Sequence, residues 1–365
     1  MINVRKQNIG NINDSKVIII NGDVTIDKLV YKDIKTTFID ILRTDFERYS
    51  AIAIEKAKFE VENCIKSILE KLQKEQQVHL TERFQTLSIQ SFLHDTLIGY
   101  ITTEDENFKE FIIDVLIDRL KSQNFSTEKS ILNDAIKLIP NLNTSTSALI
   151  ALMMLRHQMT NVSISFLLEN HFKQLSPIID IASSISNIDV EYIIQNGCTK
   201  TISGIYPIDT FENHLLKQYD LFFRKKGDKS VLDLFKAAHP EIMYEVNDMG
   251  TCMFCINRDE ENYWYFGDVN SKLFYDRLRS RGQKFLIPLI EELKEKTPPF
   301  TATEVRDYFC NLNNNWEQVF NLLNSSTLIK LDLSIVGMYL GSKIISKYTK
   351  CSSLSISNLN NIISL

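Results

Sequence analysis

Glycine is scarce in this sequence, with 11 residues where an average composition would supply roughly 25. Glycine forms tight β-turns and the loops that cradle phosphate groups. The sequence contains no Gly-x-Gly-x-x-Gly motif, no P-loop and no Gly-x-Ser-x-Gly elbow. We therefore expect a mainly α-helical protein, without a motif for dinucleotide binding, nucleotide binding or serine-hydrolase chemistry.

Long apolar runs and an excess of positive charge are also missing. The longest apolar run covers the eight residues 148–155, whereas a helix needs roughly 20 residues to span a bilayer. The first residues lack the charged-then-apolar pattern of a secretory signal. The net charge of −5 creates no global attraction to nucleic acid or anionic lipid. We expect a cytoplasmic protein without a membrane segment.

Cysteine and histidine are present without the spacing of a metal or catalytic site. Cys252 and Cys255 form a Cys-x-x-Cys pair, but a structural zinc site needs two further ligands at defined spacing. The pair lies in a β-like run rather than at a helix start, so a packing role is favoured over metal or redox chemistry. Asp114 and Asp118, with Arg119 beside them, fit a solvated helix face. We predict no catalytic, cofactor-binding or metal-binding residue, although a site assembled from distant residues stays open.

A β-hairpin is predicted near the start of the chain. Two β-branched runs, residues 16–20 and 24–26, flank an Asn-Gly-Asp turn. A lone hairpin is marginal in water, so its strands should pair with something else. Two interpretations stay open, because the hairpin could cap this chain's own body or pair edge to edge with other copies.

Residues 31–79 carry an apolar stripe with helical spacing and no proline or glycine. A single helix of this length suggests a coiled coil or a helix shared between chains. The alternative is two ordinary helices broken near Ser50. On the first interpretation, the predicted oligomer interface comprises Val17, Ile19, Val24, Ile26, Leu42, Phe46, Tyr49, Ala53, Val61, Ile65, Ile68 and Leu72.

The remaining sequence suggests three further segments. Residues 80–195 predict a helical bundle, and residues 196–296 a small mixed α/β region. In that region, strands at 250–256 and 263–266 should pair and be covered by a helix at 273–279. Residues 297–365 have the order of a winged helix, with a capping box from Thr301 to Glu304, a helix cap at Ser334 and a last strand near 354–356. The predicted divisions are therefore 1–30, 31–79, 80–195, 196–296 and 297–365.

Nucleic-acid binding through this tail lacks the expected charge. The candidate recognition helix, residues 316–323, contains no lysine or arginine, although phosphate contacts need cations. A winged helix used for protein contact is therefore favoured. If nucleic acid is bound, the candidate contacts are Arg277, Arg279, Arg281 and Lys284.

Several short motifs distributed over the chain resemble a known family. They are Gly22-Asp23-Val24-Thr25-Ile26, residues 29–34, 138–142 before 149–152, 219–222, 333–340 and 354–356. Together they are similar to a family of uncharacterised bacterial proteins. The chain departs from the family's closing motif at Ser334, where the family has threonine, and at Lys343 and Lys347, where it has paired arginines. The resemblance implies a cytosolic bacterial protein from a mobile-element or phage-defence gene neighbourhood, with no established reaction.

We interpret the sequence as that of a non-enzymatic scaffold or sensor that assembles with itself and with protein partners, without a cofactor. The alternative is a nucleic-acid-binding regulator that acts through the winged-helix-like tail. A second alternative is an effector enzyme, such as a nuclease, whose site the sequence does not reveal.

Overall fold

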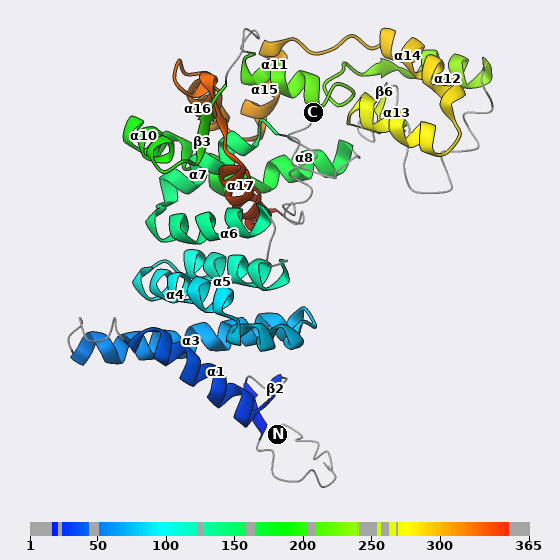
Figure 1. Ribbon diagram of the computed structural model, residues 1–365. Coiled ribbons are helices and arrows are strands. Elements are labelled where there is room, and N and C mark those ends of the chain that lie inside the picture. Colours follow the sequence, from blue (N-terminus) through cyan, green and yellow to red (C-terminus); the bar gives the residue numbers. More distant parts are fainter. Residues whose placement is uncertain are drawn as a thin grey trace, which may run out of the picture. The chain divides into compact units, whose positions relative to one another are not determined.

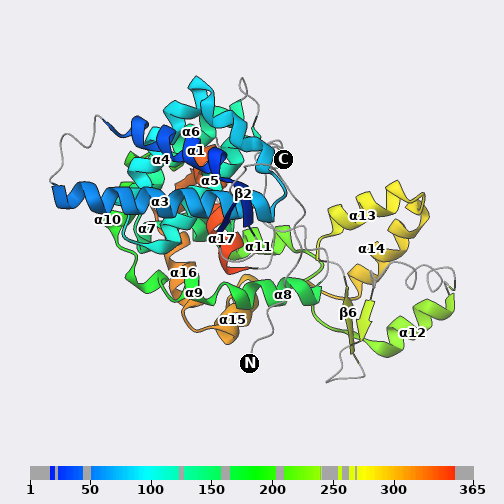
Figure 2. The same ribbon diagram turned by 90° about the horizontal axis from the view of Figure 1, so that it is seen from below.

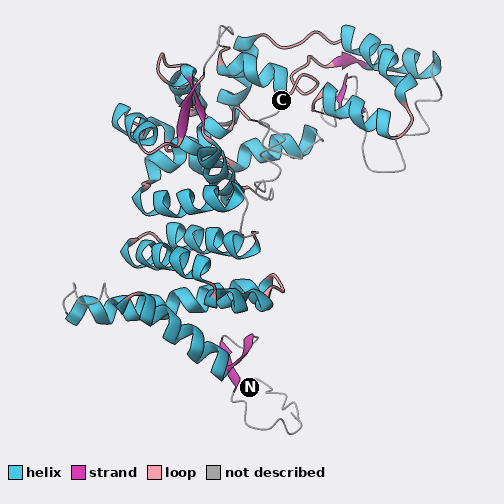
Figure 3. Ribbon diagram, viewed as in Figure 1, coloured by secondary structure: helices cyan, strands magenta, loops and turns pink. Residues whose placement is uncertain are grey.

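The computed structural model describes residues 17–20, 24–43, 51–122, 127–157, 165–202, 209–238, 240, 254–256, 263–267 and 269–349. These residues are mainly helical, as predicted, with short strands in small sheets (Figures 1 and 3). The chain divides into two compact units, Met1–Leu142 and Asn143–Leu365, called unit 1 and unit 2 below.

Unit 1 begins with the predicted hairpin. Strands β1 (Val17–Ile20) and β2 (Val24–Asp27) pair antiparallel, with Val17 opposite Asp27 and Ile20 opposite Val24. Helix α1 (Lys28–Ile41) follows β2 directly and packs against it. The antiparallel pairing of β1 with β2 confirms the predicted hairpin.

The single long helix predicted over residues 31–79 is wrong. Helix α1 and helix α3 (Ala51–Lys74) pack against each other (Figure 2). Lys35 of α1 forms an ion pair with Glu62 of α3. In one straight helix these residues, 27 positions apart, would be separated by about 40 Å. The chain therefore reverses between the two helices, and the alternative of two separate helices holds.

Five further elements complete unit 1 after α3. They are η1 (Val78–Gln85), α4 (Leu87–Thr102), α5 (Glu106–Lys121), α6 (Thr127–Leu138) and η2 (Ile139–Asn141). Helix α5 packs against α3, α4 and α6, and its residues Ile112, Leu116 and Leu120 are fully buried. Gly99 of α4 permits close contact with η2, since a Cβ atom there would lie 2.7 Å from Pro140 Cγ.

The core of unit 2 is built on helix α7 (Thr144–Met154), which Asn143 caps through a capping box with Thr146. The most extensive helix contact is with α17 (Ile335–Tyr348), where Gly341 allows close approach: a Cβ atom there would lie 2.9 Å from Met154 Cβ. This capping signal also divides the predicted 80–195 bundle, because α4 to α6 belong to unit 1 and α7 belongs to unit 2.

Short helices surround α7 and α17 in unit 2. Aromatic rings pack between these short helices. The ring centroids of Phe172 and Phe309 lie 4.8 Å apart in an edge-on arrangement, and those of Phe309 and Trp316 lie 4.5 Å apart. The elements are α8 (Ser165–Gln174), α9 (Ser176–Ile179), η3 (Ala182–Ser184), α10 (Asn187–Gln195), α11 (Phe211–Gln218), α15 (Ala302–Leu312) and α16 (Trp316–Leu323).

A three-stranded sheet forms the predicted mixed region of unit 2. Strand β6 (Tyr263–Phe266) lies between β5 (Phe254–Ile256) and β4 (Gly227–Asp228), antiparallel to both. The predicted pairing and cover are confirmed, because Trp264 and Phe266 share a buried cluster with Phe274 and Leu278 of α13. The helices of this region are α12 (Lys229–Ala238), α13 (Ser271–Ser280), η5 (Lys284–Leu286) and α14 (Ile287–Glu295).

The C-terminal segment keeps the predicted element order but packs onto earlier parts of the chain. The capping box from Thr301 to Glu304 and the cap at Ser334 are both present. Strand β7 (Leu331–Leu333), which follows η6 (Leu328–Lys330), pairs with β3 (Thr199–Thr201), and α17 packs on α7. Residues 297–349 therefore belong to the body of unit 2, and the predicted last strand at 354–356 lies outside the described residues.

Candidate functional site

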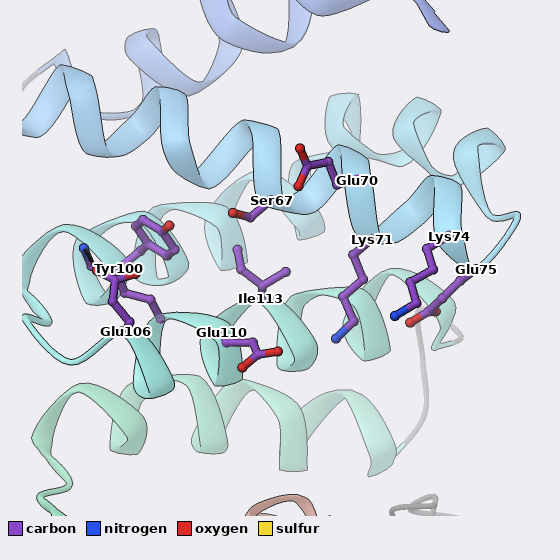
Figure 4. A pocket seen from close by; sticks show the side chains of 10 residues that line it. Ser67, Glu70, Lys71, Lys74, Glu75, Tyr100, Glu106, Glu110 and Ile113 are labelled. Atoms are coloured by element: carbon purple, nitrogen blue, oxygen red, sulfur yellow. Dashed lines mark hydrogen bonds and ion pairs between the residues drawn. The ribbon is translucent and has the colours of Figure 1, made fainter. Parts of the chain in front are cut away.

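A groove of about 460 Å³ opens between α3, α4 and α5 in unit 1 (Figure 4). Ser67 of α3 and Ile113 of α5 lie near its centre, and Lys71 and Lys74 extend from α3 towards α5. The other lining residues are Glu70, Glu75, Tyr100, Glu106, Lys109 and Glu110. The groove is therefore lined mainly by charged side chains of both signs.

Ion pairs between α3 and α5 organise these charges. The Lys109 ammonium lies 2.9 Å from Glu60 and 3.0 Å from Glu106, Lys71 pairs with Asp114, and Lys121 pairs with Glu75. The pairs follow one another in the same order on both helices, so α3 and α5 run in parallel. Asp114, predicted on a solvated face, is thus part of an interhelical ion pair.

Lys109 is the most buried charge in the groove, with 9% of its side chain exposed. Burial opposes its charge, but hydrogen bonds to Glu60 and Glu106 outweigh this effect and raise the pKa of Lys109. Its ammonium also lies 5.3 Å from the centre of the Tyr100 ring, a distance at which a cation is attracted to the ring face. Lys109 therefore stays charged and joins the three helices that line the groove.

Several charges that line the groove, among them Lys71, Glu75 and Lys109, are held in ion pairs, so the groove presents polar contacts rather than an apolar surface. Across the described ranges, no group of three or more histidine, cysteine, aspartate or glutamate side chains gathers in a way that could hold a metal ion. A polar segment entering the groove could exchange these ion pairs for its own.

The predicted oligomer stripe is largely core of unit 1. Leu42, Val61, Ile65, Ile68 and Leu72 are at most 1% exposed within a single chain. Helices α1, α3, α4 and α5 of the same chain cover these side chains. They therefore have no exposed surface that a second chain could bury. Ala53 is half-buried, whereas Phe46, Tyr49 and the side chains of Val17, Ile19, Val24 and Ile26 lie outside the described residues.

A different face of α3 is uncovered. Near the N-terminal end of this helix, Ile52 is 83% exposed and Phe59 is 62% exposed. The two residues are one heptad apart and lie on one line along the helix, with exposed Glu55 and Lys56 on either side of it. We call these four residues the α3 tip. The sequence analysis did not predict the α3 tip, although Ile52 and Phe59 are seven residues apart. The apolar stripe through Ala53 and Val61 already accounted for the helical spacing, so no second apolar line was sought.

The predicted nucleic-acid contacts lie at the end of α13 and in η5. Arg277 is half-buried, with its guanidinium carbon 5.7 Å from the centre of the Phe274 ring, and burial and Arg281 lower its pKa. Arg279, Arg281 and Lys284 are exposed, and Arg279 lies 2.7 Å from Asp276. Phe285 follows with 55% of its surface exposed.

A histidine–carboxylate pair in unit 2 also escaped sequence analysis. His157 Nε2 lies 2.7 Å from Asp332 Oδ1, and the Lys200 ammonium lies 3.5 Å from the same carboxylate. Burial opposes ionisation of Asp332, but the hydrogen bond from His157 outweighs it and lowers the pKa of Asp332. Neighbouring Arg156 donates to the carbonyl oxygens of Leu328 and Leu331. In the part of the chain that the structure describes, no hydroxyl or thiol hydrogen-bonds to His157, so the pair joins β7 to the turn that follows α7.

Three cysteines with described side chains, Cys64, Cys198 and Cys310, are free, and the first two are buried. Burial raises the pKa of the Cys64 thiol, and it raises the pKa of the Cys198 thiol to about 11. Both residues are therefore protonated at neutral pH, which agrees with packing roles. The side chains of Cys252 and Cys255 lie outside the described residues.

A protein-family model described as ":-like" matches residues 29–358. The chain belongs to this family. The match begins within α1 and ends beyond α17, so it covers helices of both units and leaves out the hairpin. Its description names no reaction, ligand or partner. No curated protein and no solved structure matches the chain.

The family match agrees with the resemblance found in the sequence only in its extent, because the short motifs quoted above lie mostly within residues 29–358. None of the helices in the described ranges is both long and apolar enough to cross a bilayer.

Proposed function

We propose that this protein is a non-enzymatic scaffold of the bacterial cytoplasm that associates with copies of itself through the α3 tip. The observation that carries the proposal is the exposure of Ile52 and Phe59 on one helical line. Exposing a large apolar side chain to water is unfavourable, and covering it with a second apolar surface removes this unfavourable free energy. The resemblance to bacterial proteins from phage-defence neighbourhoods favours a role in such a system.

The charges of the α3 tip fit a second copy of the same helix. When two such helices lie in parallel about a two-fold axis, each residue faces its own counterpart along the apolar line. Ile52 then packs on Ile52 of the second copy, and Phe59 on Phe59. Because Glu55 and Lys56 lie on opposite sides of this line, each Glu55 faces a Lys56 of the second copy. The pairing is therefore complementary in both apolar contact and charge.

The expected affinity is modest. Burying each isoleucine or phenylalanine side chain contributes about 1.5–3 kcal/mol, so four side chains contribute roughly 6–12 kcal/mol. Association costs roughly 4–15 kcal/mol in lost motion. The most favourable balance, about 8 kcal/mol, corresponds to a dissociation constant on the order of 1 µM, and every smaller balance gives weaker association. Edge pairing of the β1–β2 hairpin, or a partner segment in the groove, would strengthen such an assembly.

Replacing Phe59 by aspartate tests the proposal, because the side chain is exposed and its loss leaves the fold intact. We expect Phe59→Asp to weaken association at least tenfold in light scattering of the full chain. Leu87, at the start of α4 and 83% exposed, provides the matched control: Leu87→Asp should associate like the wild type. Equal association of all three proteins would contradict the proposal.

A second candidate function is nucleic-acid binding, which the exposed cations Arg279, Arg281 and Lys284 beside exposed Phe285 favour. Cations neutralise phosphates, and an exposed aromatic ring can stack on an unpaired base. Neutralising the three cations should abolish retention of single-stranded DNA, and wild-type retention should fall steeply with salt. A control with three other exposed lysines neutralised, Lys32, Lys137 and Lys217, should keep it.

A further inference from the structure

The groove between α3, α4 and α5 has the size of a ligand-binding site. Its volume of about 460 Å³ falls within the range of ligand-binding pockets. Most such pockets are lined mainly by apolar side chains. In this groove seven of the ten lining side chains are charged, and the other three are Ser67, Tyr100 and Ile113 (Figure 4). A ligand of the groove is therefore polar and carries charge of its own.

One end of the groove has more negative than positive charge. Here the Lys109 ammonium lies 2.9 Å from Glu60 and 3.0 Å from Glu106, so two carboxylates share one cation. Glu60 is largely enclosed, with 14% of its side chain exposed, whereas 80% of the Glu106 side chain is exposed. Glu106 can therefore turn to the cation of a ligand while Lys109 stays paired with Glu60.

The other end of the groove carries a positive charge. Lys71 is paired with Asp114, and Glu75 with Lys121. Lys74 lies between them in the sequence, is exposed, and forms no ion pair within the described ranges of the chain. Its side chain extends from α3 towards α5 (Figure 4). An acidic group of a ligand can therefore bind Lys74 without breaking an existing ion pair.

The distance between the two ends requires an extended ligand. Glu106 and Glu60 approach the same ammonium group, so Glu60 marks the level of the acidic end along α3. Lys74 lies about 21 Å further along this helix, at 1.5 Å per residue. In an extended peptide, side chains six positions apart lie on the same face and are separated by about 20 Å. A free amino acid is too short to reach both ends.

We infer that the groove binds an extended peptide segment of a partner protein. A lysine or arginine of the segment pairs with Glu106, and an aspartate or glutamate six positions away pairs with Lys74. The buried pair of Lys109 with Glu60 stays intact. This binding does not depend on self-association, because the α3 tip lies near the N-terminal end of α3 and the α3 residues of the groove begin at Ser67.

Fluorescence anisotropy of the full chain with two heptapeptides tests the inference. The first peptide has lysine at one end, glutamate at the other, and alternating serine and alanine between them. The second has the same composition, with lysine and glutamate adjacent at its centre, so it reaches only one end of the groove at a time. Both carry an uncharged dye at the N-terminus and an amide at the C-terminus. We expect the wild type to bind the first peptide about threefold more tightly, which is the contribution of one further exposed ion pair.

Removing the charge at either end should abolish this preference. Glu106→Gln and Lys74→Gln should each bind the two peptides equally, because only one ion pair then remains for either peptide. Lys137→Gln, at an exposed lysine of α6, is the matched control and should keep the preference. Phe59→Asp should keep it too, which separates this inference from self-association. A wild type that binds neither peptide, or both equally, overturns the inference, and so does a preference that survives in Glu106→Gln or Lys74→Gln.

Discussion

His171 of α8 should make the stability of unit 2 depend on pH. The residue is 3% exposed, and burial lowers the pKa of its imidazole from 6.5 to about 4. The folded protein therefore keeps His171 neutral at pH 5, whereas the unfolded chain takes up a proton below pH 6.5. Since the unfolded state binds more protons in this range, the free energy of unfolding falls as the pH falls. From these two pKa values, the loss between pH 8 and pH 5 is about 2 kcal/mol.

Tryptophan fluorescence during urea unfolding measures this effect in unit 2. Both tryptophans, Trp264 and Trp316, belong to that unit. His171→Phe should lose about 2 kcal/mol less unfolding free energy than the wild type between pH 8 and pH 5. The exposed His79 gives the control, because His79→Phe should follow the wild type. Equal pH dependence of the wild type and His171→Phe would refute the reasoning.

Two further substitutions test the packing of each unit. Gly337→Ala should destabilise unit 2 by more than about 2 kcal/mol, because a Cβ atom there would lie 2.0 Å from the Cys198 carbonyl oxygen; a fluorescence-monitored urea midpoint like that of the wild type would contradict this. Lys109→Met should destabilise unit 1 by about 2–4 kcal/mol, because it leaves Glu60, with 14% of its side chain exposed, without its cation. Thermal unfolding followed by circular dichroism checks the second substitution, and an unchanged transition would show that the pair contributes nothing.

Local signals in the sequence predicted local structure well. The Asn-Gly-Asp motif between two β-branched runs predicted the β1–β2 hairpin. The helix caps predicted at Thr301 and Ser334 are present. Turns and caps depend on residues within a few positions of one another, so they can be recognised without knowing the fold.

Pairings between distant residues could not be predicted. The apolar period of α3 indicates that one face is buried, but not whether α1 of the same chain or a second chain covers it. The contact of His157 with Asp332 spans 175 positions and depends on β7 pairing with β3. Arg119, beside Asp118, has the sequence context of a surface residue, and only the packing of α5 among its neighbours encloses it.

Self-association through the α3 tip is tested most directly by exchanging its charges. In sedimentation velocity from about 1 µM to 1 mM, the wild type should associate, and Glu55→Lys and Lys56→Glu should each stay monomeric because like charges then face each other. An equimolar mixture of the two variants should associate again, since it restores opposite charges on both sides of the apolar line. A wild type that stays monomeric throughout, or a mixture that sediments like the separate variants, would contradict the account.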